Sequence, residues 1–266
     1  MKKLFLIILL SITLTGGSEG NEMNKMYLKQ GELDLSRLVG SKIFFAHQSV
    51  GYNIVSGIEN ILKESGVADI KVIEITDPNQ FSEAVFGHMK IGQNKDPFSK
   101  LADFRLKMES GIGERTTIAC FKFCYVDVTR DTNLESVMRF YSKTFDYLEK
   151  KFPKTVFIHF TVPLLVQPRG FLITLKRKLG ISVNDDLDNV ARNNFNDLLR
   201  AKYRERVFDM ARFESEYDKQ NETFIYKNQK YTSLLPIFTD DGGHLNGLGA
   251  RVIAYELLSY LNSKAQ

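Results

Sequence analysis

Cysteine is scarce in this sequence of 266 residues, which contains only Cys120 and Cys124. Both lie in the apolar segment 117–126, which reads as one buried strand. Four residues at ~3.3 Å each would separate their Cα atoms by roughly 13 Å, too far for a disulfide bond. We therefore expect two buried free thiols.

The N-terminal apolar run is too short to span a membrane. Lys2 and Lys3 precede residues 4–14, and small residues follow at 15–18. A bilayer needs ~20 apolar residues, so the pattern indicates a secretory signal over residues 1–20. No cysteine follows closely, which argues against lipid attachment. We expect a periplasmic or extracellular protein with no stable membrane span; an uncleaved anchor or a buried first helix is the alternative.

A large excess of charge is also missing. Without Lys2 and Lys3, the formal net charge falls from +4 to +2. A near-neutral domain argues against binding to nucleic acid. The basic clusters 176–178 and 200–206 are typical of solvated helix faces, although an anionic glycan or lipid headgroup could bind there.

The chain has no internal repeat, low-complexity tract or interdomain linker, which favours a single domain over residues 21–266. Strand and helix patterns alternate along it. The predicted strands are 43–46, 70–75, 117–126, 155–162 and 206–210; the predicted helices centre on 54–62, 134–152, 187–199 and 252–261. The alternation predicts an α/β fold, a three-layer α/β/α sandwich around a parallel five-stranded sheet.

Two long segments do not fit this alternation. Residues 76–115 and 214–238 are polar, with only short apolar pieces. Both follow strand ends at the carboxyl edge of the sheet, where parallel sheets bind ligands. We expect both segments to form walls of a pocket.

Three residues supply the parts of a serine nucleophile. Ser49 stands between the first strand and the first helix, and Asp241 and His244 precede the last helix. A serine hydroxyl reacts at neutral pH only when a base takes its proton, and a carboxylate can orient that base. Backbone N–H groups at a helix start could stabilise the developing oxyanion.

Each residue also has an ordinary interpretation. Ser49 could be a simple helix cap, and His244 could sit in a turn capped by Asn246 with Asp241 as its ion partner. Their conjunction at the two predicted places favours catalysis.

Other polar residues receive structural interpretations. His47 lines the pocket or caps the turn, and His88 and His159 are ordinary surface or core histidines. Lys122 is an ion partner of Asp127 or a pocket residue, and we favour the pairing. A metal site would draw on Asp240, Asp241, His244 and His47, but no His-Glu-x-x-His or cysteine-pair motif accompanies them. We expect no metal and no cofactor.

These features resemble the SGNH (GDSL-type) hydrolase superfamily over most of the mature chain. The resemblance rests on the strand–Ser49–helix start, the Asp-x-x-His before the last helix, and Phe-Thr-Val-Pro-Leu at 160–164. It implies a flavodoxin-like fold, Ser49 as nucleophile with Asp241 and His244, and an oxyanion hole completed by a glycine and an asparagine. Members of the family are mostly esterases, lipases and carbohydrate O-deacetylases that use no metal.

Two blocks depart from the family pattern. Gly-Asp-Ser is His47-Gln48-Ser49 here, and Gly-x-Asn-Asp appears at 124–127 as Cys-Tyr-Val-Asp. The asparagine donor is therefore missing at 126. Asn94 with the Gly92 amide, or Asn53 one helical turn after Ser49, are the candidate replacements.

The sequence thus predicts an exported serine esterase that acts on acyl esters through an acyl-Ser49 intermediate, with O-acetylated glycans as the most natural substrate. The partner would be a small-molecule or glycan ester. An acyltransferase on the same site, or a non-catalytic carbohydrate-binding module on the same fold, are the alternatives.

Overall fold

The computed structural model describes residues 33–66 and 69–265, and residues 34–266 cluster as one compact unit. The predicted signal segment lies outside the described residues. In chain order the helices and strands are β1 (Lys42–His47), α2 (Val50–Glu64), β2 (Lys71–Glu74), β3 (Val85–Lys90), α3 (Pro97–Lys107), β4 (Ile118–Phe121), α4 (Leu134–Lys151), β5 (Val156–Phe160), α5 (Phe171–Lys178), α6 (Asn184–Tyr203), β6 (Val207–Phe208), α7 (Met210–Ser215), β7 (Glu216–Tyr217), β8 (Gln220–Asn221), β9 (Thr223–Tyr226), β10 (Gln229–Thr232) and α8 (Gly247–Lys264).

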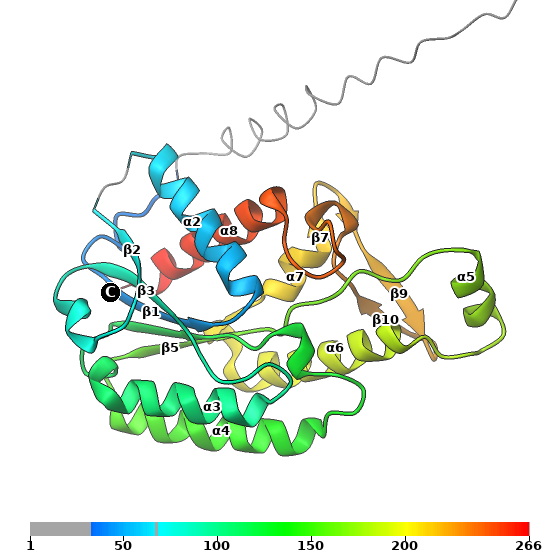
Figure 1. The fold of residues 1–266 in the computed structure, drawn as a ribbon, viewed down its shortest axis with the longest axis horizontal. Coiled ribbons are helices and arrows are strands. Elements are labelled where there is room, and N and C mark those ends of the chain that lie inside the picture. The colour runs from blue at the N-terminus through cyan, green and yellow to red at the C-terminus, as the bar shows by residue number, and fades with distance from the viewer. Residues whose placement is uncertain (1–32, 67–68, 266) are drawn as a thin grey trace, which may run out of the picture. The chain divides into compact units, whose positions relative to one another are not determined.

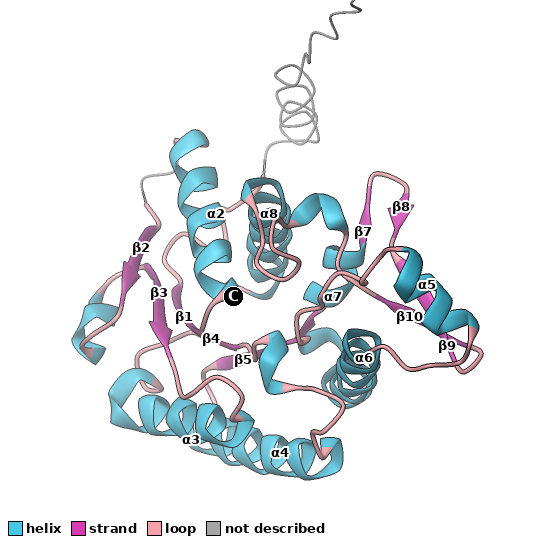
Figure 2. Cartoon of the chain, turned by 45° about the vertical axis from the view of Figure 1, so that its right-hand side comes forward, coloured by secondary structure: helices cyan, strands magenta, loops and turns pink. Residues whose placement is uncertain are grey.

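The central sheet is parallel, as predicted, but it has six strands rather than five. Their order is β2-β3-β1-β4-β5-β6. Helices α2, α7 and α8 cover one face, and α3, α4 and α6 cover the other (Figures 1 and 2). The three-layer α/β/α prediction is therefore confirmed and the strand count is corrected.

The additional strand, β3, lies in the segment 76–115 that we expected to be irregular. It pairs with both β1 and β2. Gly87 in its middle allows close packing, since a Cβ there would lie 2.6 Å from Ile75 Cγ1 and 2.8 Å from the Phe81 ring. A short strand interrupted by glycine carries little apolar periodicity, which is why the sequence pattern did not indicate it.

Aromatic side chains fill the core beneath α3, α4 and α6. Phe104 packs against Phe44 and Phe121 with ring centroids 6.1 and 5.2 Å apart, and Phe121 packs against Tyr141 at 5.7 Å. All four side chains are almost completely buried. Such pairs hold α3, through Phe104, and α4, through Tyr141, against the sheet.

On the opposite face, α2 and α8 cross at very short range. A Cβ on Gly57 of α2 would lie 2.4 Å from the carbonyl oxygen of Ala250 and 2.8 Å from Ala254 Cβ in α8. Only glycine at position 57 permits this approach. Gly57 lies seven residues after the start of α2 and Ala250 three residues after the start of α8, so the crossing is within about 11 Å of both helix starts along the helix axes.

The two cysteines are buried and free, as predicted. The strand that contains Cys120 is shorter than expected: β4 ends at Phe121, and Cys124 precedes a turn of 3-10 helix at Tyr125–Asp127. No helix among residues 33–66 and 69–265 has both the length and the apolar content needed to cross a bilayer.

Candidate active site

Ser49 occupies the turn between β1 and α2 in a strained backbone conformation. Its φ is 47° and its ψ is −108°, a region that side-chain-bearing residues rarely adopt. Its side chain makes no capping bond to α2, so the simple helix-cap interpretation does not fit. A sharp strand-to-helix turn of this kind presents a serine hydroxyl at the edge of a sheet.

The Ser49 turn is held by the residue before it. The Gln48 side-chain amide donates to the carbonyl oxygens of Ile91, at 2.6 Å, and Gly92, which follow β3. The carbonyl oxygen of Gln48 accepts a bond from Cys124 Sγ at 3.4 Å. The serine is thereby fixed between the loops that follow β3 and β4.

The second turn, 239–245, is tied together by Asp241. Its Oδ1 accepts the backbone N–H groups of Gly243 and His244 at 2.9 and 2.8 Å. Gly242 has φ 92°, which favours glycine, and a Cβ on Gly243 would lie 2.7 Å from Leu165 and 3.1 Å from the Tyr125 ring. Both glycines are therefore required, one for its conformation and one for space.

The two turns meet at His244. Ser49 Oγ lies 2.5 Å from His244 Nε2, and His244 Nδ1 lies 2.7 Å from Asp241 Oδ2. If Nδ1–H donates to the carboxylate, Nε2 is free to accept the serine proton. Bonds from Gly243, the His244 ring and the His244 amide lower the pKa of Asp241, which keeps it ionised.

The candidate oxyanion donors differ in whether their N–H groups already donate hydrogen bonds within the protein. The Gly92 amide donates to Asp103 Oδ2 at 2.8 Å, so that candidate is occupied. The Asn94 side chain is exposed, and its Oδ1 accepts from Lys100 Nζ at 2.9 Å, which leaves its amide N–H groups without a partner among the described residues. Asn53 Oδ1 is buried and has no hydrogen-bond partner among residues 33–66 and 69–265.

Backbone N–H groups offer a further source of donors. Within residues 33–66 and 69–265, neither the Ser49 amide nor the Val50 amide donates a hydrogen bond. In a strand–serine–helix turn, the amide after the nucleophile is well placed to stabilise an oxyanion. The sequence analysis expected such N–H groups at this helix start, and the structure identifies the amides of Ser49 and Val50.

The predicted pairing of Lys122 with Asp127 is wrong. Asp127 pairs with Lys100 at 2.5 Å, and both side chains are fully buried. Lys122 instead donates to the carbonyl oxygen of Phe123 at 2.9 Å, and burial lowers its pKa. Lys100 was missed because it lies on α3, inside the segment expected to be irregular; Asp96 followed by Pro97 was the available helix-start signal.

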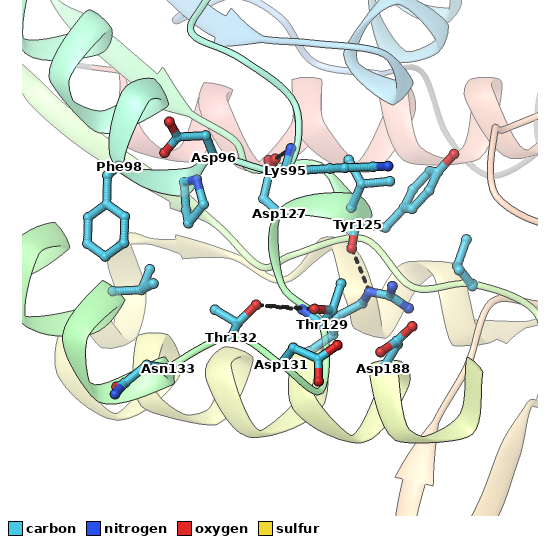
Figure 3. A pocket seen from close by; sticks show the side chains of 15 residues that line it. Lys95, Asp96, Phe98, Tyr125, Asp127, Thr129, Asp131, Thr132, Asn133 and Asp188 are labelled. Carbon is cyan, nitrogen blue, oxygen red and sulfur yellow. Dashed lines mark hydrogen bonds between the residues drawn. The ribbon is translucent and has the colours of Figure 1, made fainter. Parts of the chain in front are cut away.

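A cavity of about 560 Å³ lies beyond the carboxyl ends of β4 and β5, and Ser49, Asp241 and His244 are not among the residues that line it. Tyr125 connects the cavity to the candidate triad, since it lines the cavity and its ring centroid lies 5.8 Å from that of His244. Figure 3 shows polar side chains around this space. The lining residues come from loops and from α3, α4 and α6; they are Lys95, Asp96, Pro97, Phe98, Tyr125, Val126, Asp127, Thr129, Asp131, Thr132, Asn133, Val137, Leu165, Asp188 and Arg192.

Only one of the two long segments forms a wall of this cavity. Residues 95–98 contribute, as expected for segment 76–115. Segment 214–238 does not line it; its hairpin β9–β10 borders a separate depression of about 350 Å³. This part of the prediction was wrong because the hairpin packs against α6 beyond the cavity.

The other histidines are structural. His47 and His88 are buried side by side, with His47 Nε2 3.1 Å from His88 Nδ1. Burial lowers the pKa of His47 to about 2. His159 contacts the Tyr141 hydroxyl at 2.9 Å inside the core. In the part of the chain that the structure describes, no three His, Cys, Asp or Glu side chains are placed to share a metal ion.

No protein-family model matches this chain, and no curated protein matches it by sequence. Its fold is similar to those of several solved structures. One, a protein provisionally called a platelet activating factor from Streptococcus pneumoniae, is 13% identical over 91% of this chain and 97% of its own, with a TM-score of 0.48. Another, provisionally placed among lipolytic proteins of the G-D-S-L family, is from Desulfitobacterium hafniense DCB-2. It is 10% identical over 83% of this chain and 99% of its own, with a TM-score of 0.46.

Proposed function

We propose that this chain is an exported serine esterase whose nucleophile is Ser49. The observation that carries the proposal is the continuous series of contacts from Ser49 Oγ to His244 and on to Asp241, at 2.5 and 2.7 Å. If Ser49 were only a helix cap and His244 only a residue at a helix start, nothing would require their side chains to be in contact. The resemblance of the two motifs to SGNH hydrolases supports the same assignment.

The reaction follows from the geometry. Ser49 Oγ attacks the ester carbonyl carbon while its proton passes to His244 Nε2. The tetrahedral intermediate collapses as the alcohol leaves with that proton, which gives an acyl-serine. Water then gives a proton to Nε2 and attacks the acyl carbon, and Ser49 recovers its proton as the acid leaves. Asp241 stabilises the imidazolium in both halves.

The cavity beside Tyr125 supports a glycan as the alcohol part of the ester. Its volume suits a small ligand. Carboxylates such as Asp131 and Asp188 can accept hydrogen bonds from sugar hydroxyls, and Phe98 and Tyr125 offer aromatic surface. We therefore propose O-acetylated glycans as the substrate class.

A fluorophosphonate probe tests the nucleophile without knowledge of the substrate. We expect labelling of the native protein, none of Ser49→Ala, and almost none of His244→Ala. The double variant should be scarcely worse than either single one, because triad members act as a unit. Ser56→Ala, an exposed serine on the same helix, is the matched control and should label normally.

Unchanged labelling of Ser49→Ala would refute the proposal. A folded native protein that fails to label would favour a carbohydrate-binding module. With 4-nitrophenyl acetate and an added sugar acceptor, acetate release identifies a hydrolase and acetyl-sugar formation identifies a transferase.

Export is tested separately. N-terminal sequencing of native protein should place the mature start near residues 17–22. Retention of Met1 would contradict processing.

A further inference from the structure

Helix α5 carries an exposed apolar surface that the esterase chemistry does not use. It protrudes at one end of the molecule, as Figures 1 and 2 show. Phe171 is 81% exposed, Leu172 70% and Leu179 65%; Leu175 and Ile181 are also exposed. Five large apolar side chains in eleven residues form a patch of a kind that marks an interaction site.

The apolar residues gather on one side of the helix, between two lysines. At about 100° per residue, Phe171, Leu175, Leu179 and Leu172 fall within an arc of about 100°. Lys176 lies about 40° beyond one edge of this arc and Lys178 about 20° beyond the other. Both lysines are exposed and can extend their charges past the apolar surface.

The opposite side of α5 is held to the rest of the protein. Arg177 donates to both carboxylate oxygens of Asp186 in α6 at 2.8 Å and to the carbonyl oxygen of Pro168 at 3.0 Å. Ile173 is half-buried on this inner side. The apolar side is therefore turned outward by fixed contacts.

A second protein copy fits this surface poorly. Eight residues of helix extend only about 12 Å, far less than the roughly 800 Å² per partner that a stable protein interface buries. Binding of a helix to a lipid surface does not require a protein interface of that area. An amphipathic helix with Phe and Leu on one side and flanking lysines matches the arrangement that lies in the headgroup region of an anionic bilayer.

We propose that α5 is an interfacial anchor that docks this protein onto an anionic phospholipid surface. This goes beyond the proposed esterase function and does not depend on it. The anchor is connected to the candidate active site, because the segment before it passes the catalytic turn, where the Val166 amide donates to the Gly242 carbonyl oxygen at 3.0 Å. Five residues from Val166 to Phe171 span at most about 17 Å, so docking would bring the catalytic turn near the membrane.

The absence of tryptophan from the chain makes a site-specific test possible. Phe171→Trp introduces a single fluorophore at the tip of α5, and Leu106→Trp introduces one at a similarly exposed position, 64%, on α3. Each full-length variant is titrated with vesicles of phosphatidylcholine alone or with phosphatidylglycerol. A signal at position 171 reports α5 itself, whatever residues 1–32 do.

We expect emission from Trp at 171 to shift to shorter wavelength with the anionic vesicles and emission at 106 to stay unchanged. Adding Lys176→Gln and Lys178→Gln to Phe171→Trp should weaken binding about 25-fold, roughly fivefold for each lysine. Adding Leu172→Ser should weaken it by about tenfold or more. Lys143→Gln, an exposed lysine on α4, is the control and should change little.

Several results would overturn the proposal. These are no shift at position 171 at saturating lipid, an equal shift at 106, or equal binding to neutral vesicles that is insensitive to the lysines. Response to a sulfated polysaccharide but not to vesicles would assign the patch to an anionic glycan. A dimer that Leu172→Ser dissociates, without any vesicle response, would assign it to self-association. None of these readouts depends on Ser49.

Discussion

The crossing of α2 and α8 offers the sharpest test of how the fold positions the candidate triad. Ser49 immediately precedes α2, and His244 lies just before α8. Gly57→Ala adds a Cβ that would lie 2.4 Å from the Ala250 carbonyl oxygen, where ordinary contact begins at 3.4 Å. The difference, 3.4 − 2.4, requires the two helices to separate by 1.0 Å.

A displacement of 1.0 Å is large compared with the 2.5 Å distance between Ser49 Oγ and His244 Nε2. Carried to the helix starts, it would lengthen the Ser49–His244 contact from 2.5 Å to about 3.5 Å. A misplacement of ~1 Å can cost about 10²-fold in rate. Overpacking should also lower the free energy of unfolding by about 1–3 kcal/mol. Gly57 itself lies about 12 Å along the helix from Ser49, so it cannot touch the reacting atoms.

The assay is the rate of fluorophosphonate labelling, measured beside urea unfolding and far-ultraviolet circular dichroism. Gly66→Ala is the matched control: it lies just beyond the same helix, has φ 67° and has no atom within 4 Å of its would-be Cβ. It should lose about 1 kcal/mol from backbone strain and keep its labelling rate. Ala254→Gly should partly rescue Gly57→Ala, because it removes the contact at 2.8 Å but not the one at 2.4 Å.

A folded Gly57→Ala protein that labels at the native rate would refute this reasoning. Equal slowing by Gly66→Ala would attribute the effect to general destabilisation instead.

Three further outcomes are expected. If Asn94 donates to the oxyanion, Asn94→Ala should lower kcat by roughly 10²-fold with little change in KM, whereas loss only in Asn53→Ala would assign the role to α2. Thiol titration should find Cys120 and Cys124 unreactive in the native protein and two free thiols after unfolding without reductant, since both are buried; fewer than two would indicate a disulfide. Burial raises the pKa of Glu214 to about 8 from 4.5. The native state therefore keeps a proton that the unfolded chain loses, and stability should fall as pH rises between these values. Glu214→Gln should flatten this part of the urea-unfolding profile, and an unchanged slope would contradict it.

The sequence predicted best those features that are encoded within a few neighbouring residues. Asp241 and His244 lie three residues apart, and the glycines between them allow only a tight turn, so their contact follows from the local chain. Ser49 could be placed because a buried strand and an amphipathic helix flank it. Its contact with His244 needed the parallel sheet as well, which the alternation of elements supplied.

The features that could not be predicted depend on long-range packing. β3 is recognisable as a strand only because β1 and β2 pair with it on either side. Arg192 is 2% exposed on α6, where it donates to the Tyr125 carbonyl oxygen at 2.8 Å. A buried arginine has no distinct pattern on a helix that also carries many solvated charges. The cavity wall that it helps to form therefore emerges only in three dimensions.

The buried Lys100–Asp127 pair shows how one such contact could offset the missing asparagine at position 126. Asp127 accepts bonds from the Lys95 amide at 2.9 Å and the Cys124 amide at 2.6 Å, so it joins the loops that follow β3 and β4. Lys100 bridges this carboxylate to Asn94 Oδ1, which fixes the side chain that could donate to the oxyanion. Breaking a buried pair typically costs about 3–5 kcal/mol, and here it would release Asn94 at the same time. A variant of Lys100 would therefore confound stability with catalysis. Asn94→Ala leaves the Lys100–Asp127 pair in place and removes one acceptor from Lys100, so its urea-unfolding midpoint is measured beside kcat to separate the two effects.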